Sequence, residues 1–245
     1  MVNVYMNPEK LEGRIAGLED FAQSAIESRA TIHCMYANDP IKSGESLGSL
    51  ELAVVNAANA IKSHAEELRK CKTTMVNLNS NGVANHDLEG GVSIEVPDDS
   101  AGLETADKFG KWAQGATDAN DLRSGKDKLP SGRSIDEVRE SMKANKGDTT
   151  YANSFIDRAG PENLTKLGDK NPKNNREAPI VGEILATASG TWDKEKSKRN
   201  ADLIVGSVDE KDEWERIPIF NQMIRDHGVN GAKFGTDFLV SVGNA

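Results

Sequence analysis

The chain has 245 residues, of which 37% are hydrophobic, 28% are charged and only 5% are aromatic. This composition is typical of a helix-rich globular protein and poor for a β-sandwich, so it favours an all-α fold. The formal net charge of −9, without a long basic run, argues against nucleic acid and anionic membrane surfaces as partners, because like charges repel.

The sequence shows no targeting or membrane-spanning segment. No stretch approaches the roughly 18 apolar residues that are needed to cross a bilayer. The N-terminus, Met1 to Pro8, lacks both the basic start and the apolar stretch of a secretory signal. We therefore expect a protein that stays in the cytoplasm, leaves the cell by a leaderless route, or has lost a leader.

Two long helices are predicted first, over residues 1–80. Apolar and small residues recur in alternating steps of four and three, which is the pattern of a heptad seam. The first seam contains Leu11, Ile15, Leu18, Ala22, Ala25, Arg29, Ile32 and Tyr36. After a turn-rich segment the second contains Leu47, Leu50, Val54, Ala57, Ile61, His64, Leu68, Cys71, Met75 and Leu78. Helices of roughly 30 residues, each about 45 Å long, would form an antiparallel hairpin.

The two seams can be paired along their whole length. The pairs are Tyr36 with Leu47, Ile32 with Leu50, Ala25 with Ala57, Leu18 with His64, and Leu11 with Cys71. Cys34 then lies near the turn and Cys71 near the far end, too far apart for a disulfide, so we predict that both cysteines remain thiols. His33 and His64 are likewise kept apart, which argues against a zinc site with the cysteines.

The predicted seam has two unusual members and a neighbouring stripe. His64 should pack against Leu18, and Arg29 should extend its charged end from the seam into water. A second apolar stripe beside the seam needs cover from the C-terminal half or from another hairpin. It consists of Phe21, Ile26, Val55 and Ala58.

Residues 81–133 form an irregular connecting region in this interpretation. Val92, Ile94 and Val96 alternate as in a short strand, so we expect at most a minor β element near 92–96. A short helix is predicted over about 103–116, carrying Phe109 and Trp112.

Residues 134–245 are predicted to be a compact bundle of shorter helices. Ser134 and Glu137 have the spacing of a capping box at the start of one helix. Further helices are expected over about 149–159, 178–189, 193–208 and 212–227, and after Thr236. In the segment "DRAGPENLTKL", Gly160 should end one helix and Pro161 should begin the next, so the segment is interpreted as a corner and not as a ligand loop.

No motif that carries chemistry is recognisable, so we assign no catalytic, cofactor-binding or metal-binding residue. The P-loop, the nucleophile elbow, the zinc-protease motif, the paired cysteines and the calcium loop are all missing. The residues best suited to a metal or acid–base site are His86, Asp87 and Glu89, together with a second group of Asp226 and His227. Trp112, Trp192 and Trp214 are interpreted as core anchors.

Several stretches resemble known families. The hairpin resembles the helix-turn-helix of WXG-type proteins exported by type VII secretion, and the leaderless N-terminal domains of larger type VII substrates. The stretches "MNPEKLEGRIAGLEDFAQSA", "AIKSHAEELRKC", "YANSFIDRAGPENLTKL" and "FGTDFLVSVGNA" are similar to a poorly characterised actinobacterial family of large helical proteins without an assigned activity. The resemblance implies an interaction region at the front of a longer protein, truncated after Ala245.

The leading hypothesis is a non-catalytic helical module that binds a protein partner, or a second copy of itself, through the apolar face of the hairpin. An alternative is a hydrolase or toxin-like enzyme with a site between the two halves, drawing on His86, Asp87 or His227. A third is a structural component of a phage or of a cell surface. No cofactor is expected for any of them.

Overall fold

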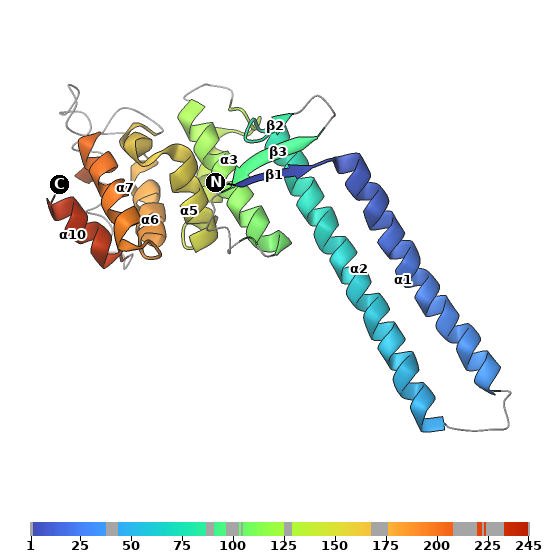
Figure 1. Cartoon of the computed structure of the whole chain (residues 1–245). Coiled ribbons are helices and arrows are strands. Elements are labelled where there is room, and N and C mark those ends of the chain that lie inside the picture. Colours follow the sequence, from blue (N-terminus) through green and yellow to red (C-terminus); the bar gives the residue numbers. More distant parts are fainter. Residues whose placement is uncertain are drawn as a thin grey trace. The chain divides into compact units, whose positions relative to one another are not determined.

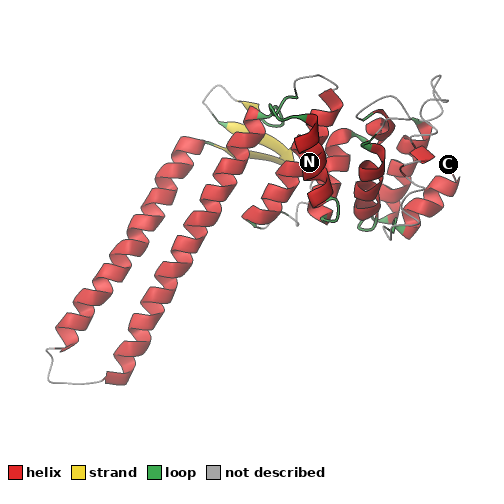
Figure 2. Ribbon diagram, turned by 180° about the vertical axis from the view of Figure 1, so that it is seen from behind, coloured by secondary structure: helices red, strands yellow, loops and turns green. Residues whose placement is uncertain are grey.

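The computed structural model describes residues 2–37, 44–86, 91–96, 103, 105–124, 129–167, 176–207, 220–221, 223 and 233–244. Within these ranges the protein is mainly helical, with one small sheet, which confirms the predicted all-α class (Figure 2). Contacts divide the chain into two compact units. The first contains Met1–Val76 and His86–Pro97, and the second contains Asn77–Asn85 and Asp98–Ala245.

The first unit is dominated by the predicted hairpin. Helix α1 covers Pro8–Ala37 and helix α2 begins at Gly44 and ends at Ser80. The two run side by side in opposite directions (Figure 1). Lys62 on α2 donates to Gln23 on α1 at 3.2 Å, and Arg29 near the end of α1 donates to Glu51 near the start of α2 at 3.4 Å. These pairs agree with the register derived from the sequence.

The seam on α1 is confirmed from Leu11 to Ala25, while the side chains of Ile32 and Tyr36 lie outside the described part of the chain. The seam on α2 is partly wrong. Ile15 is fully buried on α1, as expected. In the described part of α2 the buried residues include Met75 and Leu78, as expected, but also Ala58 and Ala65 in place of Ala57 and His64, which lie one position earlier and are exposed. Helix α2 is therefore rotated relative to the prediction, and His64 is not a seam histidine.

The cause of this rotation is visible in the residue types. The apolar positions at 54, 61, 68 and 75 are shared by two overlapping stripes, so the heptad pattern alone does not choose between them. Alanine at 58 and 65 leaves room for α1 to approach, and the same rotation turns Lys62, Arg69 and Lys72 toward polar partners on α1. Side-chain size and charge thus decide which stripe faces the partner helix.

A small sheet accompanies the hairpin. Strand β1 (Val2–Met6) pairs antiparallel with β3 (Val92–Val96), and β2 (Asn85–His86) completes the order β1-β3-β2. The minor β element near 92–96 is confirmed, but its partner at 2–6 was missed, since the two strands lie far apart in the sequence. Tyr5 lies over Gly91, where a Cβ would come within 2.4 Å of the ring, so a larger residue at that position would displace the Tyr5 side chain.

The second unit is a bundle of shorter helices. Its described elements are α3 (Ala106–Ser124), α4 (Ile135–Asn145), α5 (Thr149–Ala159), η2 (Pro161–Lys166), α6 (Ala178–Ser189), α7 (Lys194–Gly206) and α10 (Thr236–Asn244). Helix α5 packs against α3, α6 and η2, and α7 packs against η2 and α10. Helix α3 is longer than expected and contributes Ala119 and Leu122 to the core of this unit.

Two local features of the bundle confirm sequence predictions. Ser134 and Glu137 form the capping box at the start of α4. Helix α5 ends at Ala159, Gly160 has a φ of +79°, and Pro161 begins a short 3-10 helix, so this segment is the predicted corner. Most of the helix expected over 212–227 lies outside the described residues.

The crossing of α3 and α5 depends on Gly115. A Cβ built at this position would lie 2.4 Å from the carbonyl oxygen of Tyr151 and 3.2 Å from Cβ of Ser154. The Ser154 hydroxyl donates to the carbonyl oxygen of Trp112 at 2.6 Å, which ties the two helices together beside the glycine. This close approach positions the polar side chains that α3 and α5 share.

Candidate functional site

One side of the hairpin carries ion pairs between its helices. Arg69 on α2 contacts Glu19 at 2.8 Å and Glu12 at 3.6 Å, and Lys72 contacts Glu12 at 2.5 Å. The hydrogen bond from Arg69 lowers the pKa of Glu19, and that from Lys72 lowers the pKa of Glu12. Exposed pairs of this kind contribute little stability. They link α1 and α2 at positions that agree with the antiparallel register.

A similar cluster lies toward the turn. Glu51 accepts a hydrogen bond at 2.8 Å from Nδ1 of His33 and others from Arg29. The bond from His33 is the main cause of a lowered pKa at Glu51. Arg29 therefore extends into solvent from the seam, as predicted, but it also crosses to α2. His33 is explained by the same carboxylate without a metal ion.

The opposite side of the hairpin exposes apolar side chains, which we call the open flank: Phe21 on α1 and Leu50, Ala57 and Leu68 on α2. Phe21 is 63% exposed and Leu50 is 54% exposed. A helix turns by about 100° per residue. Phe21 therefore lies across α1 from Glu12 and Glu19, which form the ion pairs.

The open flank on α2 is the stripe that the sequence suggested as the seam. Leu50, Ala57 and His64 are spaced by seven residues and are all exposed, and Leu68 follows at 36% exposure. Since α1 packs against the neighbouring stripe through Ala58 and Ala65, the heptad positions of Leu50, Ala57 and His64 stay exposed in the described part of the chain. Of the predicted second stripe, Phe21 is exposed, Ala58 is buried in the seam, and Ile26 and Val55 are half-buried.

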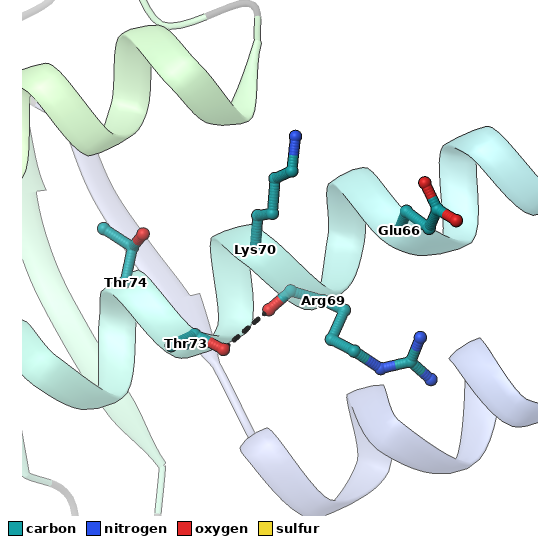
Figure 3. Close-up of a pocket in the computed structure, with 5 residues that line it drawn as sticks. All are labelled: Glu66, Arg69, Lys70, Thr73 and Thr74. Carbon is teal, nitrogen blue, oxygen red and sulfur yellow. Dashed lines mark hydrogen bonds between the residues drawn. The ribbon is translucent and has the colours of Figure 1, made fainter.

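Two hollows on the described part of the hairpin are lined by charged and polar side chains. The larger, of about 490 Å³, is open and is lined by five residues of α2: Glu66, Arg69, Lys70, Thr73 and Thr74. Figure 3 shows that the side chains of Arg69 and Lys70 diverge. The Thr73 hydroxyl donates a hydrogen bond to the carbonyl oxygen of Arg69 at 3.0 Å. The smaller hollow lies beside Glu19, Asp20, Gln23, Lys62 and Glu66.

The second unit contains a dense buried polar network on α3. Asp118 is fully buried and accepts hydrogen bonds from Arg133 at 2.6 Å, Tyr151 at 2.6 Å, Ser141 at 2.7 Å and Gln114 at 2.9 Å. These donors come from α3, α4, α5 and the segment before α4. The carboxylate therefore joins three helices of the bundle at one point.

Asp121, one turn further along α3, completes the network. It is 1% exposed and contacts Arg133 at 2.7 Å, the Ser131 hydroxyl at 2.5 Å and the Ser131 backbone N–H at 3.0 Å. Burial and the nearby charge of Asp118 raise the pKa of Tyr151 far above its usual range, so this phenol stays protonated as a donor. The hydrogen bonds of both carboxylates come from side chains and backbone of the unit itself, as is usual for buried polar groups.

This network was not predicted from the sequence. The spacing of Asp118 and Asp121 places both carboxylates on one helix face, within the stretch "AQGATDANDL" of mostly small residues. Asp118 also shares a helix face with the apolar Leu122, one turn further along, and an acid on an apolar face signals a buried polar contact. The partner Arg133 could not be identified in the same way, because it lies in a loop.

The residues considered for the enzyme hypothesis are not brought together in the described structure. His86 lies in β2, whereas Asp87, Glu89, Asp226 and His227 lie outside the described residues. Trp192 is buried, donates from its ring nitrogen to Asn153 at 2.7 Å and meets Phe238 edge to face, as predicted for a core anchor. Trp112 stacks on Phe109, and Trp214 lies outside the described ranges.

In the part of the chain that the structure describes, no three side chains of histidine, cysteine, aspartate or glutamate group as metal ligands. Cys34 is exposed, Cys71 is half-buried, and neither forms a disulfide. None of the described helices combines the length and the apolar character that a membrane crossing needs.

Comparison with known proteins adds one assignment. No curated protein and no solved structure matches this chain. One family model does match, over residues 1–245, and its description is "Family of unknown function (DUF6571)". Since the match covers the whole sequence, the chain belongs to this family of unknown function, DUF6571.

Proposed function

We propose that this protein is a non-catalytic helical module that binds a helix of a partner protein, or of a second copy, along the open flank of its hairpin. The single observation that carries the proposal is the heptad stripe of Leu50, Ala57, His64 and Leu68 on α2, which α1 leaves exposed. A helix with apolar residues at matching positions can pack into such a stripe, because its side chains repeat with the same period.

The chemistry of the two sides of the hairpin supports one binding face. The ion-pair side already satisfies its charges internally through Arg69 and Lys72. The open flank offers Phe21 and Leu50 instead, and large aromatic and aliphatic side chains supply most of the energy of protein interfaces. The partner surface should therefore be apolar at its centre.

Site-directed photo-crosslinking in the native host tests this proposal. A photoreactive phenylalanine analogue at position 50 or 21 should give a discrete protein adduct, whereas the same group at Leu52 should not. Leu52 is a matched control, since it is 61% exposed but lies on a different face of α2. An adduct of twice the mass of the chain identifies a second copy. Equal labelling at 50 and 52 would refute the proposal.

On the resemblance to WXG-type hairpins we further propose that this module belongs to a larger protein exported by a leaderless, type VII route. The support is the long antiparallel hairpin itself, with α1 and α2 joined at one end. Immunodetection of the intact protein in culture medium, in strains with and without a functional type VII system, tests this step. Equal amounts in both strains would exclude that route.

A further inference from the structure

Two arginines meet at the ends of α3 and α5 in the second unit. Arg123 lies in the last turn of α3 and Arg158 in the last turn of α5. Nη1 of Arg123 donates to the carbonyl oxygen of Arg158 at 2.9 Å, and Nη2 of Arg158 donates to the carbonyl oxygen of Gly82 at 3.3 Å. Both acceptors are neutral, so neither contact compensates a positive charge.

Arg158 differs in this respect from other arginines of the described structure. Arg69, Arg133 and Arg139 each contact two carboxylates, and these contacts raise their pKa. Burial lowers the pKa of Arg158, and the charge of Arg123 lowers it further. The Nε–H group of Arg158 is also buried without a hydrogen-bond partner. Arg158 is therefore desolvated and repelled by its neighbour, with no described carboxylate in compensation.

Helix dipoles account for only part of this arrangement. A cation in the last turn of a helix is stabilised by the partial negative charge of the unpaired carbonyl groups, which explains Arg123 or Arg158 taken singly. Burial of Arg158 and the positive charge of Arg123 both act against the charged form of Arg158. A negatively charged group bound beside the two side chains would favour that form.

We propose that Arg123 and Arg158 form a binding site for an oxyanion, either a phosphate or a carboxylate group. Each guanidinium has five N–H donors in a planar arrangement that matches the oxygens of such groups, and the hydrogen bonds described above use one N–H of each. The site is independent of the hairpin, and nothing in it requires the proposed interaction function.

Thermal unfolding of the full chain tests the site. The melting temperature is measured in sodium chloride, sodium phosphate and sodium acetate at equal ionic strength. Phosphate or acetate should raise it in a saturable way, and the more effective anion identifies the preferred group. Arg158→Gln and Arg123→Gln should each weaken the fitted anion affinity about tenfold, the loss expected for one charge-assisted contact.

The control is Arg199→Gln, which removes an exposed positive charge from α7 and leaves the pair intact. It measures the general stabilisation that phosphate gives to any folded protein by exclusion from its surface. Arg158→Lys keeps the charge but loses the planar donors, so its affinity should fall between those of the wild type and Arg158→Gln. If Arg158→Gln does not fold, Arg123→Gln decides, because Arg123 is exposed. Equal anion responses in Arg123→Gln and Arg199→Gln would overturn the proposal.

Discussion

Replacing Arg133 with methionine should destabilise the second unit by about 3–5 kcal/mol, the usual cost of leaving a buried charge without its partner. Arg133 contacts Asp118 at 2.6 Å and Asp121 at 2.7 Å, and these carboxylates are 0% and 1% exposed. Without Arg133 the neutral donors Ser131 and Tyr151 remain, but no described cation faces the two acids.

Urea unfolding followed by tryptophan fluorescence measures this loss, because all three tryptophans belong to the second unit. The midpoint should fall at a nearly constant m-value. Lys143→Gln is the control: it breaks the exposed pair with Glu140 and should cost no more than about 1 kcal/mol. Adding Asp121→Asn to Arg133→Met should recover part of the loss. A loss no larger than that of the control would refute the reasoning.

Three further predictions follow from the packing. Gly115→Ala should lower the free energy of unfolding by about 1–3 kcal/mol, because the added Cβ forces α3 away from α5. Gly110→Ala has open space around its Cβ and should raise that free energy by up to about 1 kcal/mol. Equal urea midpoints for the two variants would contradict this. Ala58→Leu should lower the free energy of unfolding by about 1–3 kcal/mol because Ala58 is buried, and Ala57→Leu should change it by no more than about 0.5 kcal/mol because Ala57 is exposed. Unfolding followed by helical circular dichroism measures both, and a larger loss for Ala57→Leu would favour the seam predicted from the sequence. Burial and then the nearby Asp118 carboxylate raise the pKa of Tyr151 in the folded protein, so this phenol ionises at a lower pH in the unfolded chain. The free energy of unfolding should therefore fall above about pH 10 by about 1.4 kcal/mol per pH unit. Ultraviolet titration checks this, and ionisation of all three tyrosines near pH 10 in the folded protein would disprove it.

The candidate interaction surface was only half predictable from the sequence. The heptad steps identified both long helices and their antiparallel register, since apolar periodicity is a local property of the chain. The pattern on α2 nevertheless contains two overlapping stripes, and it did not show that Ala58 and Ala65 would face α1 while Leu50 and Ala57 stayed open. That choice depends on side-chain volume and on ion pairs with a helix distant in sequence.

The paired arginines show the same limit in the second unit. Arg158 was visible within the corner segment that Gly160 and Pro161 define, and each helix end could be recognised from its neighbours. The proximity of Arg123 is a consequence of how α3 packs on α5, where Gly115 permits a close crossing. The distance at which two helices cross cannot be predicted from the residues on either side of Arg123 or Arg158.

By itself the sequence determined the helical class, the hairpin, the capping box at Ser134 and the corner at Gly160, because propensity, periodicity and capping act between residues a few positions apart. Only the tertiary structure decided that Val2–Met6 pairs with Val92–Val96, that Asp118 gathers donors from three helices, and which side of α2 remains exposed. These features depend on contacts between distant segments, whose geometry follows from packing the whole chain.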